Sequence, residues 1–134
     1  MSQANVEIVR RLYEAFETRD NALPFEVYDP EIEWYPGAVG GVGFEPVYRG
    51  HDGVREFWRS FLASWESIEF RLDELIDAGD EVVALIWQRN RGRASGAVIK
   101  YEYAQVWTLR DGLVTRQRNF LSRQDALKAV GLEE

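Results

Sequence analysis

The segment from residue 82 to residue 121 most constrains the fold, because it has the pattern of three consecutive strands. Its first strand is the apolar run 82–87, and a second, longer strand follows over residues 98–109. Asp111-Gly112 then precedes a third strand over residues 113–121. An Asp-Gly pair favours a tight hairpin turn, because glycine takes positive φ without steric cost. We therefore predict a strand meander that forms the floor of the fold.

The faces of these strands differ in chemistry. Residues 82–87 are apolar on both alternating faces, which is typical of a strand covered on both sides. The strand 98–109 has one aromatic face with a single amide, Gln105, embedded in it. The last strand alternates between one face with Arg116, Arg118 and Phe120 and another with Thr115, Gln117 and Asn119.

Helical periodicity surrounds the meander. Apolar residues at helical spacing predict a helix over 5–18, a short helix over 24–29 and a long helix over 54–65 that Asp52 or His51 caps. A short strand is expected at 32–36, and another near 68–72 with a bulge at 75–76. Ser122 and Asp125 open a last helix that reaches Val130 and ends at Gly131.

Residues 36–50 contain five glycines and two prolines, too many for a regular element. We expect a long loop. Long loops in small domains are often lids or binding loops, and a plain surface connection is the alternative.

Composition limits the function classes. The 134 residues predict one domain, residues 1–134. A net charge of −7 disfavours nucleic acid and anionic membranes as partners. No cysteine occurs, which excludes disulfides and thiolate metal sites and fits a cytoplasmic location. We also expect neither a signal peptide nor a membrane-spanning segment.

These elements predict an α+β fold, in which helices pack on the concave face of a curved, mainly antiparallel sheet. The unfilled end of such a cone is a pocket. On the assumption that helices cover only one face, the opposite face needs another cover, and a symmetric homodimer through the outer sheet face supplies it. We expect that outer face to contain Val82, Ala84, Ile86, Ala104 and Val106.

Three motifs, together with the element order, resemble the nuclear transport factor 2-like superfamily. They are Val9-Arg-Arg-Leu-Tyr-Glu-Ala-Phe, Tyr48-Arg-Gly-His-Asp-Gly-Val-Arg-Glu-Phe-Trp and Val106-Trp-Thr-Leu-Arg-Asp-Gly-Leu-Val. Within the superfamily the chain looks most like the SnoaL-like group, which includes polyketide cyclases and lies near ketosteroid isomerase. The resemblance implies a cystatin-like α+β roll, a fold that hosts enzymes and non-catalytic proteins alike.

The catalytic positions of those relatives are changed here. Ketosteroid isomerase uses a general-base Asp, a protonated Asp and a helical Tyr. The resemblance places the first position on Trp34, the second on Gln105 and the third nearest Leu12, with Tyr13 one residue away. The cyclases use a His and an Asp on strands, whereas this chain offers only His51, at a helix start.

The fold-level interpretation places an apolar lining around the pocket, which suits a planar or polycyclic ligand. Ordinary core packing is the alternative for each residue. The expected lining comprises Trp34, Phe57, Trp58, Phe61, Trp87, Tyr103, Trp107 and Phe120.

Gln105, Arg118 and His51 are the candidate catalytic residues. A Gln on an aromatic face is either satisfied by neighbours or directed at a ligand oxygen. Arg118 can polarise a carbonyl, or it pairs with Glu33 or Glu102. His51 can move a proton or cap a helix. One His, no Cys and no inward acidic cluster predict no metal, and we expect no cofactor.

The sequence thus predicts a SnoaL-like protein that binds a small apolar molecule carrying an oxygen function. As an enzyme it would catalyse a cofactor-independent proton transfer of isomerase, cyclase or dehydratase type. The alternative is a non-catalytic ligand-binding or dimeric assembly module.

Overall fold

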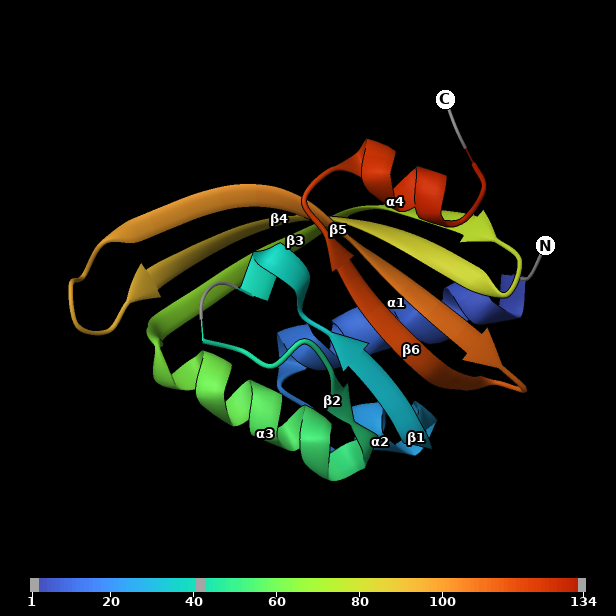
Figure 1. Cartoon of the computed structure of the whole chain (residues 1–134), viewed down its shortest axis with the longest axis horizontal. Helices are drawn as coiled ribbons and strands as arrows, with labels where there is room; N and C mark the ends of the chain where they lie inside the picture. The colour runs from blue at the N-terminus through green and yellow to red at the C-terminus, as the bar shows by residue number, and fades with distance from the viewer. Residues whose placement is uncertain (1–2, 41–42, 133–134) are drawn as a thin grey trace.

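The predicted strand meander forms the centre of a six-stranded sheet (Figure 1). The computed structural model describes residues 3–40 and 43–132. In it β4 (Glu81–Gly92), β5 (Val98–Arg110) and β6 (Leu113–Phe120) pair antiparallel in sequence order. Asp111 and Gly112 both have positive φ, 52° and 79°, so the tight turn predicted from their sequence is confirmed.

Strands on either side complete the sheet in the order β2-β1-β6-β5-β4-β3. β3 (Trp65–Ala78) pairs antiparallel with β4 at one edge. At the other edge β1 (Tyr28–Tyr35) pairs parallel with β6, and the two-residue strand β2 (Tyr48–Arg49) pairs antiparallel with β1. The predicted α+β class with a mainly antiparallel sheet is therefore confirmed.

Three helices lie on the side that the bent strands enclose (Figure 1). They are α1 (Gln3–Thr18), α2 (Leu23–Val27) and α3 (Gly50–Ala63). The apolar stripe of α1 and the inner face of the sheet share one buried cluster, as the periodicity predicted. Among the helices of the described residues, none is both long and apolar enough to span a membrane.

The last helix, α4 (Arg123–Ala129), lies on the opposite face of the sheet (Figure 1). Ser122 caps its start by accepting a hydrogen bond from the backbone N–H of Asp125 at 3.1 Å, as predicted. Its buried residues pack in a second cluster with Val83, Ala104 and Val106. The expectation that helices cover only one face was therefore wrong, because helical periodicity does not say on which side of the sheet a terminal helix docks.

Several element boundaries also differ from the prediction. β1 begins at Tyr28 rather than at residue 32. α3 begins at Gly50 without a side-chain cap, because the helical backbone starts two residues before Asp52. The register of β3 shifts between Leu72 and Glu74, before the predicted bulge at residues 75–76.

The segment 36–50 contains more regular structure than predicted. Gly37–Gly40 form a 3₁₀ turn, and β2 adds two residues to the sheet edge. Gly37 has φ 59°, which explains one of the glycines that suggested a loop. Residues 41–42 of this predicted loop lie outside the described residues.

Candidate functional site

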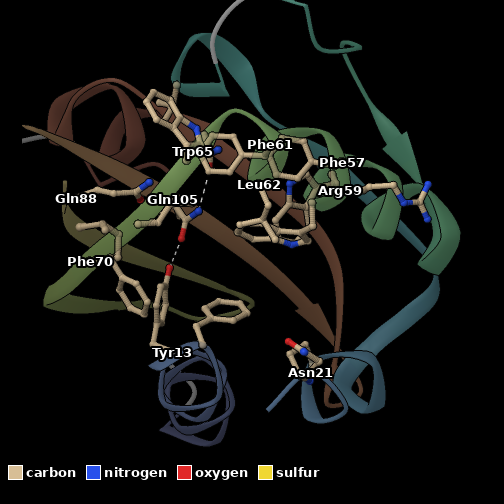
Figure 2. A pocket seen from close by; sticks show the side chains of 18 of the residues that line it. Tyr13, Asn21, Phe57, Arg59, Phe61, Leu62, Trp65, Phe70, Gln88 and Gln105 are labelled. Atoms are coloured by element: carbon tan, nitrogen blue, oxygen red, sulfur yellow. Dashed lines mark hydrogen bonds between the residues drawn. The ribbon is translucent and has the colours of Figure 1, made fainter. Parts of the chain in front are cut away.

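A cavity of about 800 Å³ lies between α1, α3 and the inner face of the sheet. This volume is within the range of small-molecule sites. Its walls are mainly aromatic, and Figure 2 shows Phe57 and Phe61 on α3 across the space from Gln105 and Tyr13. The aromatic part of the lining comprises Tyr13, Phe16, Phe25, Tyr28, Trp34, Phe57, Trp58, Phe61, Trp65, Phe70, Tyr101, Tyr103 and Trp107.

Strand register decides which side chains reach this cavity. In the sheet Ala84 is opposite Gln105, and Gln105 is opposite Asn119, so all three side chains share the inner face. By the same pairing, Val82 and Ile86 lie on the inner face with Trp107 and Tyr103. The expectation that Val82, Ala84 and Ile86 form the outer face was wrong, because a strand that is apolar on both faces gives no clue to its orientation.

A chain of hydrogen bonds crosses the inner wall. The Trp107 indole Nε1–H donates to the Tyr13 hydroxyl at 2.9 Å, and that hydroxyl donates to Gln105 Oε1 (Figure 2). Gln105 Nε2 in turn donates to Asn119 Oδ1 at 3.1 Å, and Asn119 Oδ1 also accepts from Gln117. Trp107 thus occupies one lone pair of the Tyr13 oxygen, which leaves the Tyr13 proton to be given to an acceptor.

Burial sets the charge state of Tyr13. Desolvation, followed by the neighbouring hydroxyl of Tyr103, raises the pKa of Tyr13 well above its ordinary value. The phenol is therefore neutral at physiological pH. It can donate a hydrogen bond to a carbonyl or enolate oxygen, and it is a poor base there.

A second polar group lies on the same inner face. The Tyr103 hydroxyl donates to Gln88 Oε1 at 2.7 Å, Gln88 Nε2 donates to Asn90 Oδ1 at 3.0 Å, and Asn90 Nδ2 donates to the Tyr101 hydroxyl at 3.0 Å. Burial also raises the pKa values of Tyr101 and Tyr103. Like the hydrogen-bond chain of Tyr13, this group of side chains is uncharged.

Charges appear only at the exposed part of the cavity. Arg19, Arg55, Arg59 and Arg93 contribute to its lining, and the one carboxylate among the described lining residues is the exposed Glu66. The net charge of these lining side chains is positive, although the net charge of the whole chain is −7. A charged rim of one sign favours the approach of ligands with the opposite sign.

Seven residues predicted from the sequence do line the cavity. They are Gln105, which is 9% exposed, and the apolar residues Trp34, Phe57, Trp58, Phe61, Tyr103 and Trp107. Their presence in the lining follows from the periodicity of α3 and the alternation of β5.

The other four predicted site residues lie elsewhere. Trp87 is opposite Glu102 on the outer face, and the Arg71 guanidinium lies 5.0 Å from the centre of its ring. Phe120 is also on the outer face, opposite Ala104. Both predictions were wrong, because large aromatic side chains in the sequence do not distinguish the concave face from the convex face.

Arg118 and His51, the other two candidate catalytic residues, also lie outside the cavity lining. Arg118 is opposite Val106 on the outer face and pairs with Glu81 at 2.8 Å, rather than with the carboxylates that the sequence suggested. Burial lowers the pKa of Arg118. The His51 Nε2 lies 2.9 Å from the Tyr28 carbonyl oxygen, outside the cavity lining, which is a structural position near the start of α3.

Several polar lining residues were missed in the sequence, among them Tyr13, Gln88 and Asn119 of the hydrogen-bonded inner wall. Tyr13 was assigned to the apolar stripe of its helix, although a tyrosine within such a stripe signals a hydroxyl that needs a buried partner. Gln88 continues the alternation of Val82, Ala84 and Ile86. Asn119 shares its alternating face with Gln117 and thus was visible as an amide face opposite the arginines.

Metal ligands are not grouped in the described structure. Within residues 3–40 and 43–132, no three His, Cys, Asp or Glu side chains come together in a way that could hold a metal ion.

Comparison with known structures gives closely similar folds. An NTF2-like protein from Burkholderia thailandensis has a TM-score of 0.81 and 26% identity, covering 98% of each chain. TerC, crystallised with polyporic acid, has a TM-score of 0.78 and 24% identity, covering 96% of this chain and 99% of TerC. A putative SnoaL-like polyketide cyclase from Jannaschia sp. CCS1 has a TM-score of 0.75 and 18% identity, covering 100% of this chain and 98% of the other.

No protein of curated function matches the chain. The family model of the SnoaL-like domain matches residues 9–117, which include most of α1, the cavity wall on β5 and most of β6. With this match and the fold described above, the chain belongs to the SnoaL-like domain family.

Proposed function

We propose that the protein binds a planar, mainly apolar small molecule through a carbonyl or enol oxygen that accepts a hydrogen bond from the Tyr13 hydroxyl. The observation that carries this proposal is the Trp107–Tyr13–Gln105 hydrogen-bond chain in a cavity with many aromatic side chains in its lining. In the free protein Gln105 is the acceptor for Tyr13. A ligand oxygen takes over that role or shares it.

The same geometry supports proton-transfer chemistry without a cofactor. When the proton on the carbon next to a carbonyl passes to a base, here the Glu66 carboxylate at the cavity opening or a water molecule, an enolate remains, and a fixed neutral donor stabilises its negative oxygen. Tyr13 is that donor, and Gln105 positions it. Isomerisation, cyclisation and dehydration all pass through such an intermediate, which agrees with the polyketide cyclase and isomerase types found in this family.

Non-catalytic binding is the second candidate function. The lining favours this function because it offers few groups that could act as a base. The one described carboxylate there is the exposed Glu66, and the buried tyrosines stay protonated near neutral pH. TerC, a protein of this fold, was crystallised with polyporic acid.

Two measurements separate these functions. Native mass spectrometry of freshly purified protein detects a carried ligand, and calorimetry with 1-tetralone measures binding of a one-oxygen probe. NMR then follows deuterium exchange next to the 1-tetralone carbonyl in D₂O. Faster exchange that Tyr13→Phe abolishes supports the enzyme. Binding without faster exchange supports the binding module, and no binding of ligand or probe contradicts both.

We also propose that a second copy of the chain covers the remaining apolar surface of the outer sheet face, and that the protein acts in the cytoplasm. The helix α4 covers Val83, Ala104 and Val106 there. The half-buried side chains of Leu85 and Trp87 remain as the surface for a homodimer.

A further inference from the structure

Two buried hydrogen-bond donors of the cavity have no partner within the described part of the chain. They are the Tyr28 hydroxyl and the Trp34 Nε1–H. Both side chains line the cavity, and they are only 2% and 1% exposed. Their rings are in contact, with centroids 5.8 Å apart. The residues come from one element, β1, which contributes no group to the hydrogen-bond chain of Tyr13.

Unpaired buried donors need an explanation. Leaving a buried polar group unsatisfied costs about 1–3 kcal/mol, and native structures do so rarely. An indole N–H can only donate. Burial raises the pKa of Tyr28, so its hydroxyl also keeps its proton. The group that fits both is therefore an acceptor oxygen, such as a ketone, quinone, ether or carboxylate oxygen.

Tyr28 and Tyr13 both contact Trp107, but with different ring geometries. The Tyr28 ring stacks on Trp107 with centroids 6.5 Å apart and 19° between the planes. The Tyr13 ring meets Trp107 edge-on, at 5.9 Å and 87°. Since all of these residues line one cavity, a ligand that reaches Tyr13 with one oxygen extends past Trp107 toward β1.

We propose that the cavity has a second polar subsite, formed by Tyr28 and Trp34, which binds a second acceptor oxygen of the ligand. The substrate class is then a planar apolar molecule with two separated oxygen functions, for which 1,4-naphthoquinone is a simple representative. This inference rests on the proposed function, because it assigns the first oxygen to Tyr13.

The subsite predicts an unusual combination of effects for Tyr28→Phe. The substitution removes a hydroxyl that has no partner among the residues the structure describes, so stability of the ligand-free protein is unchanged or increased. Affinity for 1,4-naphthoquinone nevertheless falls about three- to tenfold, the value of one hydrogen bond. The chain has no cysteine, so the quinone has no thiol to alkylate.

Tyr48→Phe is the matched control. Tyr48 is also buried, but it lies outside the cavity lining, and its hydroxyl accepts the Glu45 backbone N–H at 3.1 Å. We expect this variant to lose stability and to keep its affinity for the probe, the reverse of Tyr28→Phe.

The experiment is calorimetry of 1,4-naphthoquinone with the full chain and its Tyr13→Phe and Tyr28→Phe variants. ¹⁵N NMR of the Trp34 indole N–H, assigned with Trp34→Phe, gives a second readout, and a downfield shift on binding is expected. Loss of affinity in both tyrosine variants, together with this shift, supports the subsite. Loss in Tyr13→Phe alone, or an unmoved Trp34 signal, overturns the subsite and leaves the proposed function intact. No effect of Tyr13→Phe contradicts the proposed function itself.

Discussion

Replacing Tyr13 by Phe tests the central hydrogen-bond chain through stability alone, without knowledge of the ligand. The substitution keeps the aromatic ring, whose edge contacts with Phe16 and Trp107 have centroid distances of 5.7 Å and 5.9 Å. It removes only the hydroxyl that accepts from Trp107 and donates to Gln105. Any loss of stability therefore reports on hydrogen bonding rather than on packing.

The expected magnitude follows from the two partners. Trp107 is 0% exposed, so its N–H loses its partner without access to water, at a cost of about 1–3 kcal/mol. Gln105 borders the cavity, where water can replace part of the lost hydrogen bonding. The loss of the Tyr13–Gln105 hydrogen bond therefore adds only about 1 kcal/mol to the cost. The total is about 2–4 kcal/mol. At about 2 kcal/mol per M, the middle of the usual range for urea, the unfolding midpoint falls by about 1–2 M.

The assay is urea unfolding followed by tryptophan fluorescence, with circular dichroism to check that one transition describes both signals. Tyr48→Phe, which loses a single accepted bond at the edge of the sheet, is expected to cost about 1 kcal/mol. The reasoning is refuted when Tyr13→Phe costs no more than Tyr48→Phe.

Three further predictions concern residues that do not belong to the Trp107–Tyr13–Gln105 hydrogen-bond chain. Arg118→Leu should leave the affinity for 1-tetralone unchanged in calorimetry, because its side chain lies on the outer face; a change would place it in the site. Leu127→Ala should lower the free energy of unfolding by about 2–4 kcal/mol in urea, since Leu127 packs α4 onto the sheet, and a smaller loss would mean that the helix is not firmly docked. Trp87→Glu should shift the protein from dimer to monomer in sedimentation velocity, whereas an unchanged distribution would contradict a dimer through this face.

Buried tyrosines give a pH dependence. Burial raises the pKa values of Tyr28 and Tyr103 above the ordinary value of 10.0, so their stabilising contribution is complete below pH 10 and is lost as the pH rises above it. The unfolded chain then releases protons that the folded chain retains. Each such tyrosine contributes about 1.4 kcal/mol per pH unit between its unfolded and folded pKa values. Urea unfolding at pH 8 to 11 measures this slope, and a flat profile above pH 10 would contradict it.

The sequence correctly predicted those features of the fold that depend only on residues close together in the chain. The turn at Asp111-Gly112, the Ser122 cap and the α1 stripe follow from backbone preference and periodicity. The aromatic face of β5 correctly brought Gln105 into the cavity. Each of these predictions needs only neighbours in sequence.

The errors arose where the sequence allows two choices of equal quality. β4 is apolar on both faces, so only its pairing with β5 shows that Ala84 is inside and Trp87 is outside. β6 offers an arginine face and an amide face, and only its pairing with β5 shows that Gln117 and Asn119 are on the inner side, where Gln117 Nε2 donates to Asn119 Oδ1. Tyr13 was missed because its partner lies far away along the chain.

That separation has a consequence for when the proposed ligand site forms during folding. The Tyr13–Gln105 contact joins residues 92 positions apart, and the Trp107–Tyr13 contact joins residues 94 positions apart. Contacts of such long range form only after a large loss of chain entropy, typically near the end of folding. A nascent or truncated chain without β5 has α1 but no acceptor for its phenol. The proposed ligand site is therefore complete only when the sheet is complete, and recovery of probe binding after dilution from urea should coincide with the last kinetic phase.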